Sequence, residues 1–281
     1  MQKIIIIAGP TASGKTKAAI ELAQKINAEI ISVDSRQIYK EISIGTAKPS
    51  YKELCGIPHH GFNLVSIKDD FNVANFLDFF IRTAENITKH KKQIILCGGT
   101  GLYLDACLNG LSEIPEINPQ IKLEVAQIPL PNLYQKLKKI DPETKVDANN
   151  PHRVMRSYEV FLATGIPLTA WHKKPKKNKP EYQFELRVLD LPRQYLYDRI
   201  NQRVETMFKN GLIEETKKLD PIDLKKAGIG YNHVWNYLNN NQSLKEAKES
   251  MKQDTRRFAK RQLTWFRKYN FAKWLNSLQI F

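Results

Sequence analysis

Apolar residues recur along the first hundred positions in an order that predicts alternating strands and helices. Lys3–Ala8 has the continuous apolar character of a buried parallel strand, and the glycine-containing loop after it leads into a helix over Lys15–Ile26. Glu29–Val33 and Gln93–Cys97 predict two more strands, and the helical spacing of apolar residues over Asn72–Lys89 predicts a helix between them. This order predicts an α/β fold whose site lies at the carboxyl ends of a parallel sheet.

The pattern changes after residue 111, where prolines, asparagines and lysines become frequent. Short helices predicted over Asn132–Ile140 and Pro151–Thr164 replace the strands, and the lysine-rich segment 171–183 is typical of a hinge or linker. We therefore expect a core interrupted by a small helical insertion domain. The expected domains are a P-loop catalytic core, 1–111 with 183–281, and an insertion, 112–182.

After the insertion the chain predicts a returning strand and two long helices. The strand covers Phe184–Leu191, and the helix over Pro192–Asn210 is expected to end at Gly211. At about 100° per residue, the helix over Ser243–Tyr269 has one apolar face and one basic face, expected to contact the sheet and the solvent respectively. The apolar face comprises Leu244, Ala247, Met251, Phe258 and Trp265, and the basic face comprises Arg256, Lys260 and Arg267.

The composition indicates a water-soluble protein of the cytoplasm. Of the 281 residues 42% are hydrophobic, and no apolar run reaches the roughly 20 residues that cross a bilayer. The first residues lack the succession typical of a signal peptide. The three cysteines have no paired spacing, and Cys55 with His59 and His60 lacks a second ligand pair, so we expect neither a disulfide framework nor a zinc site.

Positive charge is distributed unevenly along the chain. The net charge is +15, and residues 1–111 hold 13 Lys and Arg against 10 Asp and Glu, whereas residues 112–281 hold 31 against 19. An excess of this kind outside a phosphate loop indicates a nucleic-acid partner, because basic side chains release counterions from phosphates. Charge alone is weak evidence, since many basic proteins bind no nucleic acid.

The segment Gly9–Thr16 reads G-x-x-x-x-G-K-T, follows an apolar strand and opens a helix, which is the context that a phosphate-binding loop requires. Successive backbone N–H groups would bind phosphate oxygens, Lys15 would supply a charge, and the hydroxyl of Thr16 could bind Mg²⁺. The motif by itself favours ATP or GTP and leaves the chemistry open.

Two polar residues follow the second expected strand, and a third follows the strand over Gln93–Cys97. Asp34 could hold magnesium through water, take a proton from an acceptor, or only cap the next helix. Gln37 has an amide that could pair with an adenine edge. Thr100 lies at the same expected end of the sheet as Asp34.

Several stretches together resemble the tRNA dimethylallyltransferases, the bacterial tRNA isopentenyltransferase family. They are "GPTASGKT", "DSRQIYKEISIGTAKP", "GGTGLY", "GIGY" and "TRRFAKRQLTWFRK". The resemblance runs nearly end to end and is weakest in the insertion, where Asn150, Ser157 and Tyr158 depart from the family pattern. Asn232 likewise replaces the Lys or Arg that commonly follows I-G-Y.

The resemblance implies that the loop binds dimethylallyl diphosphate and that the diphosphate is expelled. The acceptor would be N6 of the adenosine just 3′ of the anticodon, in tRNAs that read codons beginning with U. In family terms Asp34 takes the N6 proton, Thr100 lies by the reacting groups, and Arg203, or its rival Arg199, contacts the diphosphate. The implied diphosphate-binding residues are Gly9, Pro10, Thr11, Ala12, Ser13, Gly14, Lys15 and Thr16, with Mg²⁺ on Thr16.

The resemblance also implies a broad contact with tRNA, made by a protein that acts as a monomer. The target nucleotide would have to leave its stack and enter a channel. The implied RNA-contacting residues are Asp34, Ser35, Arg36, Gln37, Thr100, Lys122, His152, Arg153, Val154, Met155, Arg156, Gly228, Ile229, Gly230, Tyr231, Asn232, His233, Lys260, Arg261, Gln262, Leu263, Thr264, Trp265, Phe266 and Arg267.

Three other functions fit parts of the sequence. A small-molecule kinase would use the same loop for ATP, but it leaves the basic charge of residues 112–281 unexplained. An RNA-binding module with a nucleotide-sensing loop would need no catalytic Asp34. An isopentenyltransferase acting on free adenine nucleotide would share the chemistry and differ only in its acceptor.

Overall fold

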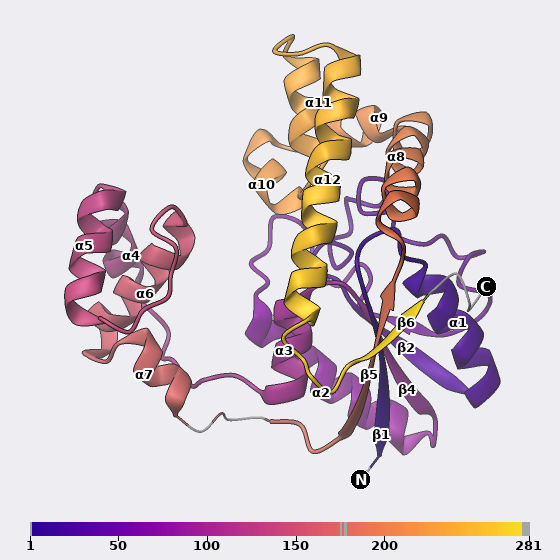
Figure 1. Ribbon diagram of the computed structural model, residues 1–281, viewed down its shortest axis with the longest axis horizontal. Coiled ribbons are helices and arrows are strands. Elements are labelled where there is room, and N and C mark those ends of the chain that lie inside the picture. Colours follow the sequence, from indigo (N-terminus) through magenta and orange to yellow (C-terminus); the bar gives the residue numbers. More distant parts are fainter. Residues whose placement is uncertain (1, 175, 177–178, 277–281) are drawn as a thin grey trace. The chain divides into compact units, whose positions relative to one another are not determined.

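The computed structural model of the protein describes residues 2–174, 176 and 179–276 (Figure 1). The chain divides into two compact units, one formed by Met1–Leu108 with Pro180–Phe281 and the other by Asn109–Lys179. Both boundaries lie slightly N-terminal to those expected from the sequence. Part of the expected linker, residues 175 and 177–178, lies outside the described residues, and its first residues, Trp171 to Lys173, instead continue a helix.

The larger unit contains a six-stranded parallel sheet in the order β3-β2-β4-β1-β5-β6. The predicted α/β fold with a parallel sheet is confirmed. The short edge strands β3 and β6 were missed, because two to four residues are too few to show a period. The strands are β1 (Lys3–Ala8), β2 (Ala28–Val33), β3 (His59–His60), β4 (Gln93–Gly98), β5 (Gln183–Asp190) and β6 (Lys273–Asn276).

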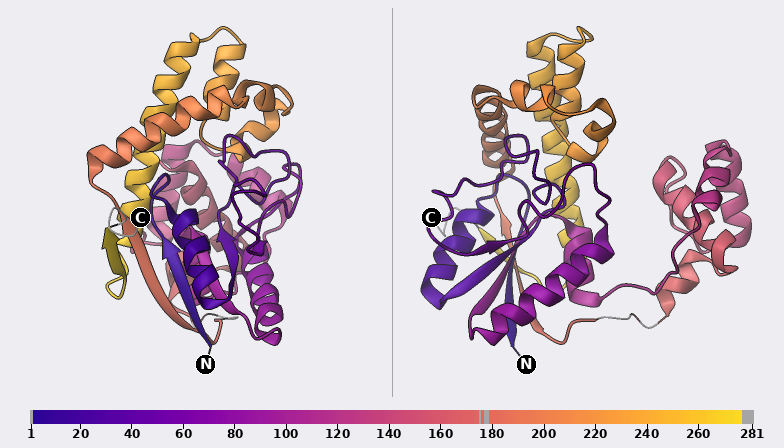
Figure 2. Two further views of the ribbon diagram at one scale, coloured as in Figure 1. Left: turned by 90° about the vertical axis from the view of Figure 1, so that its right-hand side faces the viewer. Right: turned by 180° about the vertical axis from the view of Figure 1, so that it is seen from behind.

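The two faces of the sheet are covered by different helices (Figure 2). Helix α1 (Lys15–Ile26) packs on β1, β2 and β4, where Ile30 and Ile95 belong to its apolar cluster. Helix α2 (Val73–Lys89) lies on the opposite side and packs on β4. Asn72 starts α2 with a capping box, because its side chain accepts from the backbone of Asn75 while the side chain of Asn75 accepts from Asn72 N–H. α3 (Gly101–Asn109) follows β4 directly.

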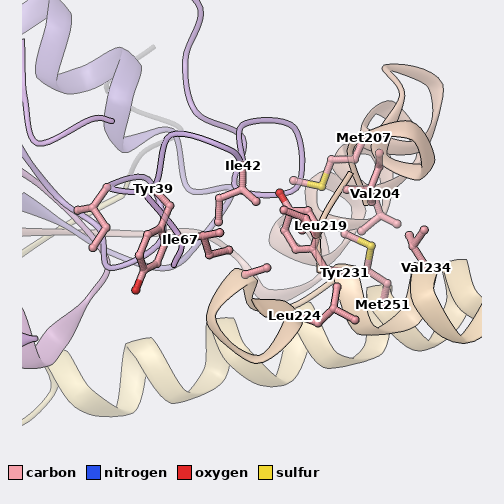
Figure 3. Close-up of a cluster of buried hydrophobic side chains, with 13 residues drawn as sticks. Tyr39, Ile42, Ile67, Val204, Met207, Leu219, Leu224, Tyr231, Val234 and Met251 are labelled. Atoms are coloured by element: carbon pink, nitrogen blue, oxygen red, sulfur yellow. The ribbon is translucent and has the colours of Figure 1, made fainter. Parts of the chain in front are cut away.

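The helices after β5 form a second apolar cluster, beyond the carboxyl edge of the sheet (Figures 1 and 3). Loop residues Tyr39, Ile42 and Ile67 belong to this cluster together with Tyr231 and Met251. Part of the segment that follows β2 therefore packs on these helices. These helices are α8 (Arg193–Lys209), α9 (Leu212–Lys217), the 3₁₀ turn η1 (Pro221–Asp223), α10 (Leu224–Ala227), α11 (Tyr231–Leu238) and α12 (Leu244–Phe266).

The long helix α12 does not pack on the sheet as the sequence predicted. Its main contacts are with α8 and α11. Its supposed solvated face is also partly engaged, since Arg256 donates a hydrogen bond to Asn201 Oδ1 of α8 at 2.7 Å. α8 ends at Gly211 as expected, because Asn210 is its C-cap and Gly211 follows with φ of +99°. Gly211 is also the N-cap of α9.

The smaller unit is an all-helical bundle. Its apolar cluster is centred on Val125, Leu133, Leu137 and Val154, which are fully buried. The helical insertion expected from the sequence therefore has a core of its own. Its helices are α4 (Pro119–Ala126), α5 (Leu130–Ile140), α6 (Pro151–Thr164) and α7 (Leu168–Lys173). Within the described parts of both units, no helix is long and apolar enough to cross a membrane.

The N-terminal cap of α12 provides a test of the fold. Ser243 accepts from Glu246 N–H and Glu246 accepts from Ser243 N–H. We expect Ser243→Ala to lower the free energy of unfolding by about 1 kcal/mol, because a helix N–H loses its acceptor. Urea unfolding followed by circular dichroism measures this. The exposed neighbour Lys245 supplies the control Lys245→Ala, and equal stability of the two variants would contradict the prediction.

Candidate functional site

The glycine-rich loop between β1 and α1 has the backbone that binding to phosphate requires. Gly9 has φ of +147°, and a Cβ there would lie 2.6 Å from the backbone oxygen of Leu189. Gly14 has φ of +91° and is the N-cap of α1, where it makes no side-chain capping hydrogen bond. Both positions therefore need glycine, and the start of α1 leaves backbone donors available to an anion.

Two side chains from distant helices hold this loop in place. Gln262 of α12 accepts from Thr11 N–H at 2.8 Å through Oε1 and donates to the Gly99 carbonyl at 3.0 Å through Nε2. Arg199 of α8 donates through Nε to the Ala12 carbonyl at 2.8 Å. Gln262 therefore joins the loop, α12 and the end of β4 through a single buried amide.

Lys15 points back into its own loop. Its Nζ donates to the Pro10 carbonyl at 2.6 Å. Burial lowers the pKa of Lys15 to about 8, helped by the charge of Arg203 and opposed by Cys97 and Asp34. An incoming phosphate would favour the charged lysine and raise this pKa.

Asp34 lies at the carboxyl end of β2 and organises the turn that follows. Its Oδ1 accepts from Arg36 N–H at 2.8 Å and from Gln37 N–H at 3.3 Å. Thr100, next to the end of β4, accepts from Ser35 N–H at 3.0 Å through Oγ1. The helix cap weighed in the sequence is not formed, because residues 35–38 form a turn and not a helix, and Asp34 caps this turn instead. Within the described residues, no hydrogen bond involves its second oxygen, Oδ2, which leaves that oxygen available to take a proton.

The amide of Gln37 is fully engaged with the protein. Its Oε1 accepts from Ser32 Oγ at 3.3 Å, and its Nε2 donates to the carbonyls of Thr46 and Ala47 at 3.2 and 3.3 Å. Pairing with an adenine edge would require these bonds to open. In this structure Gln37 therefore connects the turn after β2 to the loop at residues 43–47.

Arg203 of α8 reaches the same loop, because its Nη2 donates to the Thr46 carbonyl at 3.2 Å. Desolvation lowers the pKa of Arg203, and the carboxylate of Asp34 opposes this shift. Of the two rival arginines, Arg203 lines the cavity with Lys15, whereas Arg199 contacts the outer carbonyl of the loop at Ala12.

A cavity of about 550 Å³ brings these groups together at the carboxyl edge of the sheet. Its wall includes Cys97, whose thiol has a pKa raised to about 11 by burial and is therefore protonated at neutral pH. A cysteine nucleophile is thus not indicated. The predicted residues that line the cavity are Thr11, Lys15, Thr16, Asp34, Ser35, Arg36, Gln37, Thr100, Arg203, Gly228, Ile229, Arg261, Gln262 and Trp265.

The expected RNA-contacting residues fall into two groups. Some side chains are exposed and available to RNA, whereas others are buried, so that direct contact with RNA is not expected of them. The exposed ones are Lys122, His152, Arg153, Arg156, Asn232, Lys260, Arg261, Thr264 and Arg267. The buried ones are Val154, Gly230, Tyr231, Gln262 and Phe266, and Met155, His233 and Leu263 are partly buried.

The structure adds two groups to the site that the sequence did not single out for it. His59 of β3 lines the cavity, stacks on Phe62 and donates through Nδ1 to the Ile57 carbonyl at 2.8 Å. Glu215 of α9 accepts hydrogen bonds from the backbone at residues 43–45. Neither follows a motif. Only the tertiary packing places His59 on the cavity wall with Asp34, and Glu215, outside that wall, against residues 43–45.

Magnesium was expected on Thr16, and the donor set fits a shared site. Mg²⁺ is usually bound by one or two protein oxygens together with substrate phosphates and water. Thr16 lines the cavity at the start of α1, with Asp34 on the same wall. Among residues 2–174, 176 and 179–276, no cluster of three His, Cys, Asp or Glu could hold a metal by itself.

The parallel sheet, the glycine loop and the cavity beside Asp34 define a P-loop enzyme of phosphorylated substrates. The chain belongs to the IPP transferase family, which matches residues 37–269. The tRNA dimethylallyltransferase of Acetivibrio thermocellus is 41% identical over 288 residues, covering 98% of this chain and 92% of that protein. The resemblance stated from the sequence is therefore confirmed.

Solved structures agree with this assignment. The full-length tRNA isopentenylpyrophosphate transferase from Bacillus halodurans has a TM-score of 0.73 and 36% identity, covering 99% of this chain and 90% of that chain. A eukaryotic dimethylallyltransferase acting on tRNA has a TM-score of 0.82 and 30% identity, covering 94% of this chain and 70% of that chain.

The lowered pKa of Lys15 predicts pH-dependent binding of pyrophosphate. Lys15 loses its proton as pH rises through about 8, so the affinity should be constant well below that pH and fall above it by up to about tenfold per unit. Calorimetric titration between pH 7 and 9.5 measures this. Lys15→Arg stays charged, and the ratio of the two affinities cancels the ionisation of the ligand. If the ratio of the two affinities did not change with pH, the pH dependence could not be assigned to Lys15.

The hydrogen bonds of Gln262 predict that this side chain stabilises the phosphate loop. Gln262→Ala leaves Thr11 N–H and the Gly99 carbonyl unpaired, so pyrophosphate affinity should fall about tenfold, because an unpaired buried group costs about 1–3 kcal/mol. Affinity for tRNA should be retained. The exposed neighbour Thr264 supplies the control Thr264→Ala. Lost tRNA affinity with normal pyrophosphate binding would show that Gln262 contacts RNA instead.

Proposed function

We propose that this protein transfers the dimethylallyl group of dimethylallyl diphosphate to N6 of the adenosine just 3′ of the anticodon, in tRNAs reading codons that begin with U. The product would be N6-isopentenyladenosine. The observation that carries this proposal is the cavity, which joins a phosphate loop to the carboxylate of Asp34 and to the exposed Arg261 of α12. Such a cavity can hold a diphosphate and a nucleic-acid base side by side.

The chemistry is a displacement at the allylic carbon. The N6–C1 bond forms, the bond between C1 and the diphosphate oxygen breaks, and pyrophosphate leaves with the bonding electrons. Asp34, whose Oδ1 already organises the turn, takes the N6 proton through its second oxygen. Thr100 fixes the Ser35 side of that turn and so keeps Asp34 in place.

The leaving diphosphate needs charge neutralisation, which the loop supplies. Backbone N–H groups at the start of α1 and the ammonium of Lys15 would receive its oxygens, and the guanidinium of Arg203 would face it from α8. Mg²⁺, when bound through Thr16, would add charge stabilisation on the diphosphate. These groups interact more strongly with the expelled pyrophosphate than with the bound ester, and this difference accelerates the reaction.

Contact with tRNA is supported by the charge and position of exposed side chains. Lys260 and Arg261 are exposed on α12, Arg267 is exposed at its C-cap, and Arg261 also lines the cavity. They would bind phosphates around the entrance while the target adenosine leaves its stack. The proposed working unit is a monomer, and a tRNA substrate supports a cytoplasmic location.

The proposal predicts that labelled dimethylallyl diphosphate transfers its label to unmodified tRNA in the presence of Mg²⁺. Asp34→Asn should reduce turnover about 10²–10⁴-fold and retain tRNA binding, because the amide oxygen still caps the turn but cannot take a proton. Mass analysis of tRNA nucleosides gives the product. Asp78→Asn, an exposed carboxylate on α2, controls for the change of charge.

Parallel reactions test the rival functions. Transfer to AMP in preference to tRNA would indicate a free-nucleotide enzyme, and consumption of ATP with no need for RNA would indicate a kinase. Full activity of Asp34→Asn would remove the base from the mechanism. Label that remains wholly outside RNA in the wild-type reaction would reject the proposed function.

A further inference from the structure

The carboxylate of Glu215, on α9, is surrounded by hydrogen-bond donors from another part of the chain. It accepts from the backbone N–H groups of Ser43, Ile44 and Gly45 at 2.9 to 3.1 Å. The hydroxyl of Tyr231 donates to its Oε1 at 2.6 Å. Three successive N–H groups and a hydroxyl thus converge on one acceptor, and only an ionised carboxylate has enough lone pairs for all of them.

Tyr231 contacts both Glu215 and the loop that Glu215 binds. Its side chain is fully buried in the cluster shown in Figure 3, among residues of α8, α10, α11 and α12. A Cβ at Gly45 would lie 2.5 Å from the Tyr231 ring, so the loop rests directly on the aromatic side chain. Burial and the hydrogen bond to Glu215 raise the pKa of Tyr231, so its hydroxyl keeps the proton that it donates.

The loop held by Glu215 leads directly into the cavity. Thr46 follows the three bonded residues, and its hydroxyl donates to the Ser43 carbonyl at 3.1 Å, which closes the turn. The Thr46 carbonyl accepts from Arg203 Nη2 and from Gln37 Nε2, both at 3.2 Å. The position of one carbonyl group therefore determines the direction of the Arg203 guanidinium and of the Gln37 amide.

We propose that Glu215 is a positioning residue for the transfer reaction, acting through the loop at residues 43–47 on Arg203 and Gln37. This inference rests on the proposed function, because Arg203 matters only if a diphosphate leaves beside it. Glu215 itself lies outside the cavity wall. Its effect on the substrate is indirect and electrostatic, since it fixes the position from which Arg203 faces the departing charge.

The test compares Glu215→Gln with Glu214→Gln in single-turnover transfer with saturating dimethylallyl diphosphate and tRNA. In Glu215→Gln the new amide nitrogen faces N–H donors from which it cannot accept, so the loop should loosen and the transfer rate should fall about 10–100-fold, somewhat less than the loss of a whole oxyanion donor. KM for tRNA should stay unchanged. Glu214 is exposed and pairs with Lys217, so Glu214→Gln should keep the wild-type rate.

A double-mutant cycle separates positioning from simple destabilisation. If Glu215 acts through Arg203, Glu215→Gln should cost little more in an Arg203→Lys background, because the oriented guanidinium is already lost. Equal losses in both backgrounds would overturn the inference. So would a rate that falls only in proportion to the folded fraction measured by circular dichroism.

If Glu215→Gln does not fold, the variant Tyr231→Phe tests whether Glu215 positions the loop. It removes one donor to Glu215, keeps the ring under Gly45, and should lower the transfer rate in the same direction by a smaller factor. A wild-type rate for Tyr231→Phe would then overturn the inference. Absence of transfer by the wild-type protein would reject the proposed function instead, so the two failures are distinguishable.

Discussion

The pairing of Ala8, Val33 and Gly98 in three adjacent parallel strands is the constraint on which the site depends. Ala8 and Val33 are both in register with Gly98, from β1 and β2 on either side of β4. The segments that leave these strands therefore emerge at one level and side by side. The phosphate loop follows Ala8, Asp34 follows Val33, and Thr100 comes two residues after Gly98. Close approach at this level also needs a residue without a Cβ, since one at Gly98 would overlap the Val33 carbonyl.

Residues that leave the sheet at this edge are then fixed by helices that come much later in the chain. Gln262 of α12 and Arg199 of α8 hold the phosphate loop, and Glu215 of α9 holds the loop at residues 43–47. In each case the side chain forms hydrogen bonds with backbone N–H or carbonyl groups of a partly buried loop, and such groups need partners. The site is thus rigid because the sheet supplies position and the helices supply hydrogen bonds.

Several polar residues of the sequence motifs have a structural task in addition to their expected contact with substrate. Gln37 and Gln262 have amides that are fully occupied by protein groups, and Tyr231 is buried beneath Gly45. A motif that predicts binding from residue type cannot separate these tasks, because both require a polar side chain near the cavity. The exposed cations Lys260 and Arg261 of α12 and Arg267 at its C-cap have no such structural task among the hydrogen bonds described above, and they remain the proposed RNA contacts.

The sequence determined the elements with strong local signals: the apolar strand before the glycine loop, the helix after it, and the parallel α/β order. Each follows from periodicity or from backbone geometry over a few residues. The tertiary structure alone decided that α12 packs on α8 and α11, that Arg203 and not Arg199 lines the cavity, and that Glu215 reaches residues 43–45. These contacts join segments that lie far apart in the chain. Amphipathic spacing predicts which face of a helix is buried, but it does not predict which element packs against that face.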